Sequence, residues 1–120
     1  VDMGKMLEPN TNKIIHAAIK IGDSVVMLVD EFLNCGSASP ETLGGTPVTI
    51  HLYVEDAGSF VKKAVSAGAK VTMELMDAFW GDRYGKIVDP FGHEWSVATH
   101  IKDVTPKEME EAARQMFSQQ

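Results

Sequence analysis

The chain of 120 residues is poor in cysteine and in basic residues, and each shortage excludes a class of protein. Cys35 is the single cysteine, so the chain has neither an internal disulfide nor a cysteine-rich zinc site. A formal net charge of −6 disfavours the basic footprint of general nucleic-acid binding. No apolar run is long enough to cross a membrane. We therefore expect no nucleic-acid or membrane partner, and the lone thiol suits a cytoplasmic protein.

The chain also lacks the short motifs that identify many enzymes. It has no nucleophile elbow, no phosphate-binding loop and no CxxC redox pair. An apolar fraction of 44% over this length is ordinary for one globular domain with a modest core. We expect a single domain over residues 1–120.

The first half of the chain reads as strands. In "IHAAIKIGDSVVMLVDE" (15–31), apolar residues alternate with other residues, and the Gly22-Asp23 pair separates two such runs. Residues 36–47 are rich in Gly, Ser and Pro, which is typical of a loop. Residues 48–56 alternate again, with His51 on the polar face.

Two later segments have a helical period. Residues 56–70 place apolar side chains on one stripe, with Asp56 as a candidate N-cap. Strands are expected near 70–76, 84–89 and 93–101. Residues 105–117 begin with a capping box and carry a second stripe, which we assign to the core or to a dimer contact: Met109, Ala112, Ala113, Met116 and Phe117.

A weak internal repeat relates the two halves. A shift of 70 residues superimposes Val1 on Val71 and Gly22 on Gly92, and it aligns strand with strand and turn with turn. The pattern of the second half then predicts the element order β-α-β-β-β over residues 48–101. Residues 1–31 read as the last three strands of the same module.

The segments "HAAIKIGDSVVMLVDE", "HLYVEDAGSFVKKAVSAGAKV" and "FWGDRYGKIVDPFGHEWSVATH" together cover most of this pattern. They resemble the vicinal oxygen chelate superfamily, which includes glyoxalase I, bleomycin-resistance proteins and extradiol dioxygenases, and within it the PhnB-like branch. The resemblance implies an α+β fold of βαβββ modules, with a cupped mixed sheet and helices on its outer face. By the same comparison the chain lacks the first strand and helix, so we expect a homodimer that covers the open edge.

The resemblance also implies a small-molecule site in the cup. Trp80 and Tyr84 would form its wall, and Arg83 would offer a two-pronged donor to an anionic ligand. A local Asp82–Arg83 ion pair is the alternative. The full predicted ligand-binding set is His16, His51, Tyr53, Trp80, Arg83, Tyr84, Glu94 and Ser96.

The superfamily often holds a divalent metal, but the matching positions here are Val26, Thr49 and Ser96. These side chains do not form a catalytic metal site, so we predict neither metal nor other cofactor. A metal held by His51 and Glu94 in a shifted register is the alternative. Two functions stay open: a metal-independent small-molecule binder, and a metal-dependent lyase, isomerase or dioxygenase of the glyoxalase type.

Overall fold

The computed structural model describes residues 1–118, which form two compact units. Unit 1 is Val1–Leu43, and unit 2 begins at Gly44. The expectation of a single domain over 1–120 stays a prediction.

Unit 1 is built on a three-stranded antiparallel sheet in the order β1-β2-β3. These strands are Asp2–Leu7, Ile14–Ile21 and Ser24–Leu28, so the predicted strands of residues 15–31 are found. Gly22 has φ +62° at the turn between β2 and β3, a backbone region that glycine enters freely. A 3₁₀ turn at Leu33–Cys35 and a short helix α1 at Pro40–Leu43 follow.

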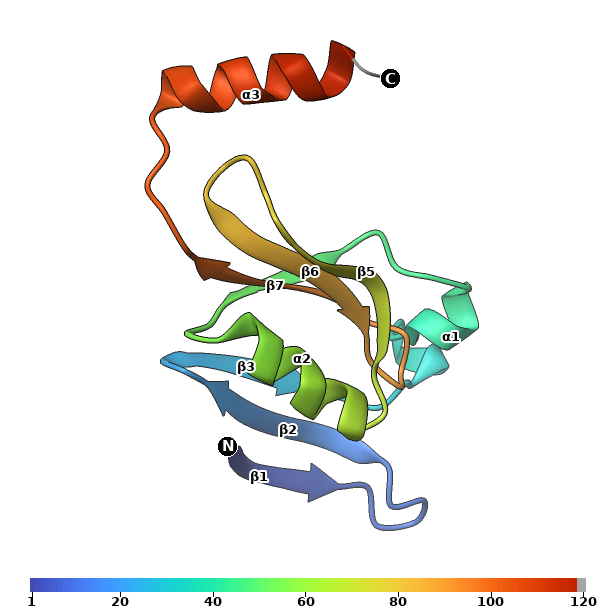
Figure 1. Ribbon diagram of the computed structural model, residues 1–120. Helices are drawn as coiled ribbons and strands as arrows, with labels where there is room; N and C mark the ends of the chain where they lie inside the picture. Colours follow the sequence, from blue (N-terminus) through green and yellow to red (C-terminus); the bar gives the residue numbers. More distant parts are fainter. Residues whose placement is uncertain (119–120) are drawn as a thin grey trace. The chain divides into compact units, whose positions relative to one another are not determined.

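Unit 2 is the predicted β-α-β-β-β module followed by a helix (Figure 1). Its elements are β4 (Thr49–Tyr53), α2 (Ala57–Ser66), β5 (Lys70–Asp77), β6 (Asp82–Val88), β7 (Glu94–His100) and α3 (Pro106–Ser118). The sheet order is β4-β7-β6-β5, with β4 parallel to β7 and the other pairs antiparallel. This mixed sheet confirms the predicted α+β class.

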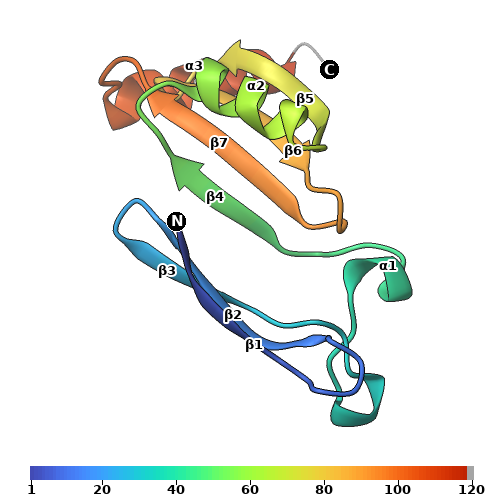
Figure 2. The same ribbon diagram turned by 90° about the horizontal axis from the view of Figure 1, so that it is seen from below.

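Helix α2 covers one face of this sheet (Figure 2). Asp56 caps it by accepting a 3.1 Å hydrogen bond from the Ser59 amide, as predicted. Beneath the helix, Val97 is fully buried and Ile87 is 4% exposed. Thr99 joins the layers, because its hydroxyl accepts a 2.7 Å bond from the Ala57 amide at the start of α2.

Helix α3 begins with the predicted capping box. The Thr105 hydroxyl accepts from the Glu108 amide at 3.2 Å and donates to the Glu108 carboxylate at 2.9 Å. Among the described residues, α3 has no extended contact with another helix or strand (Figure 1). Met116 and Phe117 are 42% and 65% exposed, so the apolar stripe is not packed in a core. A dimer contact through this stripe stays a prediction.

The 70-residue repeat has a structural counterpart. Strands β1, β2 and β3 follow one another in an antiparallel order, as do β5, β6 and β7. Gly22 and Gly92 both have positive φ at the corresponding turns. The equivalence predicted from a few identities is therefore visible in the strand order.

Candidate functional site on the open face of the second unit

Polar and aromatic side chains gather on the face of the β4-β7-β6-β5 sheet that α2 does not cover. Strand pairing sets Thr49 beside Glu94 and His51 beside Ser96, and β6 extends the same rows. Because paired residues point to the same side of a sheet, these side chains share one face. We call this set the polar face: Thr49, His51, Tyr53, Asp82, Tyr84, Lys86, Glu94, Ser96 and His100.

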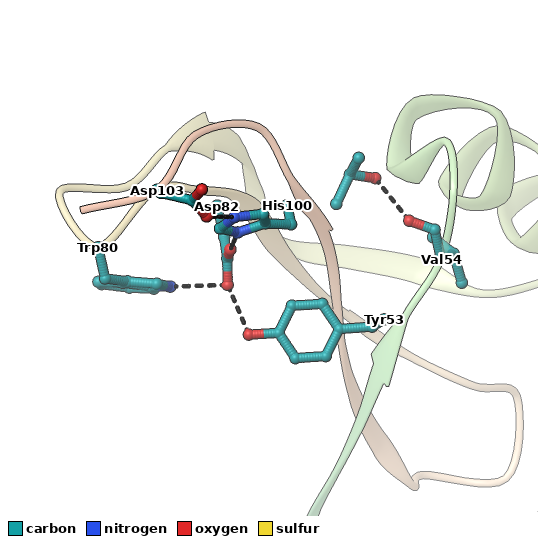
Figure 3. A network of polar contacts seen from close by, with 7 residues as sticks. Tyr53, Val54, Trp80, Asp82, His100 and Asp103 are labelled. Carbon is teal, nitrogen blue, oxygen red and sulfur yellow. Dashed lines mark hydrogen bonds and ion pairs between the residues drawn. The ribbon is translucent and has the colours of Figure 1, made fainter. Parts of the chain in front are cut away.

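Asp82 is the centre of a hydrogen-bond network at one end of the polar face (Figure 3). Its Oδ2 accepts from the Tyr53 hydroxyl at 2.7 Å and from the Trp80 indole N–H at 3.2 Å. Its Oδ1 lies 3.0 Å from His100 Nδ1. Asp82 is only 3% exposed, so three side chains from separate parts of the chain stabilise one buried carboxylate.

The network shifts the acidity of its members. Burial raises the pKa of Asp82, but the hydrogen bonds from Tyr53, His100 and Trp80 outweigh burial and leave that pKa below its ordinary value. The bond to Asp82, with burial and the carboxylate charge, raises the pKa of the Tyr53 phenol. At neutral pH, Asp82 is therefore the anion and Tyr53 the donor.

His51 occupies the middle of the polar face. Its Nδ1 lies 2.6 Å from the hydroxyl of Ser96, which is 2% exposed. The His51 and Tyr53 rings meet edge to face, with their centroids 4.7 Å apart. The His51 and Tyr84 rings are stacked, with centroids 6.0 Å apart and an interplanar angle of 29°. The Trp80 ring centroid lies 5.4 Å from that of Tyr84 and 5.0 Å from that of Phe79, so five rings form a continuous cluster. The ring of Tyr53 is held at its hydroxyl, yet the residue is 65% exposed.

Glu94 lies at the other end of the polar face. It accepts a 2.6 Å bond from the Thr49 hydroxyl and pairs with Lys86 at 3.4 Å. The Thr49 bond, and then the Lys86 charge, hold the pKa of Glu94 below its ordinary value despite some burial. Glu94 is thus an anion with two partners from neighbouring strands.

The structure brings together six of the eight predicted site residues, namely His51, Tyr53, Trp80, Tyr84, Glu94 and Ser96. Arg83 lies apart, because alternation along β6 turns it toward the α2 side. Its Nε binds Asp77 at 2.9 Å, so the alternative pairing with Asp82 is not formed. His16 is on β2 in unit 1 and is exposed. The predicted ligand roles of all eight residues stay predictions.

The donor set can be tested for a divalent metal. Val26 lies on β3, while Thr49 and Ser96 are bound to Glu94 and His51. Strand register sets Glu94 opposite Thr49 rather than opposite His51. Among residues 1–118, no group of three or more His, Cys, Asp or Glu side chains is placed to hold a metal ion. The absence of a resident metal stays a prediction.

Sequence reasoning missed the central role of Asp82 and the parts played by His100 and Asp103. The alternation of β6 puts Asp82 on the same side as Tyr84, which was a usable signal. Its three partners come from β4, the 78–81 turn and β7. Only the strand register brings them together, and a single sequence does not fix register.

Comparison with known proteins agrees with this architecture. Mycobacterium bovis protein Mb0911c is 45% identical over 115 residues, which cover 93% of this chain and 75% of that protein. The solved structure of an Arabidopsis thaliana gene product is 29% identical, with a TM-score of 0.62 over 82% of this chain and 75% of that one. A Bacillus cereus PhnB protein, described as a putative 3-demethylubiquinone-9 3-methyltransferase, shares the fold at 14% identity, with a TM-score of 0.61 over 82% and 78%.

The βαβββ unit with an open polar face defines a glyoxalase-like class of protein. Residues 2–97 match the model of the Glyoxalase/Bleomycin resistance protein/Dioxygenase superfamily. The chain belongs to this superfamily, as its sequence motifs predicted. No helix among residues 1–118 is both long and apolar enough to span a membrane.

Proposed function

We propose that the polar face binds a small organic molecule without a resident divalent metal. The observation that supports this proposal is the hydrogen-bond network around Asp82. It fixes the Tyr53 and Trp80 rings through their polar atoms. A ring that is anchored at its polar end and exposed along its side loses little freedom when a ligand packs on it. The polar face thus supplies preorganised aromatic surface with a few fixed polar groups, as small-molecule sites do.

The metal-independent part of the proposal rests on the donor chemistry. Val26, Thr49 and Ser96 stand where imidazole and carboxylate ligands are expected, and Glu94 already has Thr49 and Lys86 as partners. For a metal-dependent lyase, isomerase or dioxygenase, both His51 and Glu94 would have to leave these partners. No contact in the described residues favours that rearrangement.

The proposal includes a homodimer in the cytoplasm. In unit 1, Ala17 is 7% exposed, but many larger apolar side chains on the strands and turns are open. Exposed apolar surface of this extent is typical of a protein–protein interface, and a second copy of the chain would bury it. The exposed set is Val1, Met3, Met6, Leu7, Ile15, Val25, Met27, Leu28, Val29, Leu33 and Leu43.

The two tryptophans give a direct test of where a ligand binds. Trp80 adjoins the polar face, whereas Trp95 alternates onto the α2 side and donates to Asp89 at 3.0 Å. A library of small aromatic molecules is titrated into Trp95→Phe, which reports from Trp80, and into Trp80→Phe, which reports from Trp95. We expect hits that change emission in the first variant and leave the second unchanged. Hits that change only the Trp95 signal would contradict the proposed site.

A further inference from the structure

His100 ends β7, and both nitrogens of its ring face carboxylates (Figure 3). Nδ1 is 3.0 Å from Asp82 Oδ1, and Nε2 is 2.8 Å from Asp103 Oδ1. A neutral imidazole has a single N–H, so only the protonated ring can donate to both carboxylates. The two contacts together therefore require the charged form of His100.

The two carboxylates differ greatly in burial. The Asp82 side chain is 4% exposed, whereas the Asp103 side chain is fully exposed. Tyr53 and Trp80 both donate to Oδ2 of Asp82, so His100 is the donor for Oδ1. An unpaired buried charge costs far more than an unpaired surface charge. When the ring loses one proton, we therefore expect the remaining N–H to stay with Asp82 and a lone pair to face Asp103.

Asp103 belongs to the segment 101–105, which connects β7 to α3. The amides of Ile101 and Lys102 both donate to the Gly81 carbonyl, at 2.9 and 3.1 Å. The next polar tie along the segment is Asp103 to His100. Because α3 has no extended contact with another described element, the 101–105 segment is its connection to the sheet.

We propose that His100 and Asp103 form a pH-sensitive latch. The protonated ring holds the 101–105 segment, and with it the start of α3, to the sheet through the hydrogen bond to Asp103. The neutral ring loses this bond and keeps the bond to Asp82. Although His100 also belongs to the polar face, the latch acts on the C-terminal arm, by which we mean residues 101–105 and helix α3. It needs no ligand on the polar face, so it does not depend on the proposed function.

The direction of the response follows from the neighbours of His100. Hydrogen bonds to Asp103 and then Asp82 raise the pKa of His100 above its ordinary 6.5. The other groups nearby are Tyr53, which shares Asp82, and Lys102 in the chain, while Arg83 points to the opposite face with Asp77. A raised pKa means that the tie is complete below pH 6.5 and is lost as the pH rises through the folded-state value. The latch therefore opens above pH 6.5.

Nuclear magnetic resonance of the full chain between about pH 5 and pH 9 tests the latch. We expect the His100 ring signals to titrate above 6.5. We also expect the heteronuclear NOEs of Asp103, Val104 and the first turn of α3 to fall with the same midpoint. Flat NOEs through the His100 transition, or a His100 midpoint at or below 6.5, would overturn the proposal.

Asp103→Asn separates the latch from a general effect of pH. The side-chain amide that replaces the carboxylate can accept from a protonated ring or donate to a neutral one, so the arm should lose its pH dependence while the fold persists. His93→Gln is the matched control, because it removes an exposed histidine outside the network and should leave the midpoint unchanged. If the heteronuclear NOEs of the Asp103→Asn variant still fall with the wild-type pH midpoint, another group controls the mobility of the arm, and the latch is contradicted.

Discussion

Asp82 carries a charge at a position that solvent hardly reaches, and three donors from different elements compensate it. Such a carboxylate stabilises the fold only while its donors are present. Two of these donors, Tyr53 and His100, belong to the polar face, and the third, Trp80, adjoins it. At this scale, stability and the shape of the candidate site therefore depend on the same few hydrogen bonds.

Tyr53→Phe removes one donor from Asp82 and leaves the ring in place. We expect the free energy of unfolding to fall by about 1–3 kcal/mol, the range for an unsatisfied buried polar group. Urea denaturation measures this change. Tyr84→Phe is the control, since the described residues give its hydroxyl no hydrogen bond, and it should stay within about 0.5 kcal/mol of wild type. Equal losses in both variants would speak against the role of Asp82.

Glu31 provides a pH prediction in unit 1. Bonds from the Thr42 hydroxyl at 2.6 Å and from Ser39 lower the pKa of Glu31 to about 2. Because the pKa of Glu31 is lowered on folding, its hydrogen bonds to Thr42 and Ser39 stabilise the fold above pH 4.5. This stabilisation is lost as the pH falls toward 2. We expect Thr42→Val to raise the pKa of Glu31 toward 4.5 in a side-chain NMR titration. An unchanged pKa in this variant would assign the shift to other partners.

At the scale of elements, the turn before β6 and the segment after β7 are fitted closely together. Gly81 has φ +98°, and a Cβ there would overlap the carbonyl oxygen of Lys102. The Gly81 carbonyl also accepts from Ile101 and Lys102. Any side chain at this position would therefore separate the two segments.

Gly81→Ala should be among the more destabilising single substitutions in unit 2. Positive φ and backbone overlap together predict a loss of about 3 kcal/mol or more in the free energy of unfolding. Gly22→Ala is the matched control, because φ is +62° and nothing lies within 4 Å of the added methyl group. It should cost only about 1 kcal/mol. Thermal and urea melts of both variants decide, and a mild Gly81→Ala would contradict the close fit.

The elements themselves were largely predictable from the sequence. The change from alternation to a helical period located β4 and α2, and the capping residues Asp56 and Thr105 located the starts of α2 and α3. The short helix α1 was missed, because it lies in the segment 36–47 that was predicted to be a loop. The hydrogen-bond partners were not predictable, because they depend on strand register. The faces of Arg83 and Tyr84 could be told apart by alternation along β6, yet both were assigned to one site. Turn residues near a strand end are easily given the wrong face when the start of the strand is uncertain.

At the scale of the whole molecule, exposed apolar surface in unit 1 and the unpacked stripe of α3 lead to the prediction of a homodimer. Sedimentation equilibrium at micromolar concentration should show twice the chain mass, and the melting temperature should rise with protein concentration. A monomer with a cooperative, concentration-independent melt would contradict the dimer.

The metal prediction is tested on the purified protein. Elemental analysis should show no stoichiometric divalent metal, because the usual ligand positions carry Val26, Thr49 and Ser96. One tightly held metal per chain that disappears in His51→Ala would instead support the shifted site of His51 and Glu94. Leu28→Ala, on β3 of the other unit, controls for a general loss of folding.

Chemical-shift mapping can show whether a small molecule binds the polar face in the absence of metal. A small-molecule library is screened against isotope-labelled protein in a chelating buffer. We expect saturable shifts centred on His51, Tyr53, Tyr84 and Ser96, with little change at Ile87 and Val97 beneath α2. Shifts confined to the α2 side, or shifts on the polar face that appear only after a divalent metal is added, would contradict the proposal.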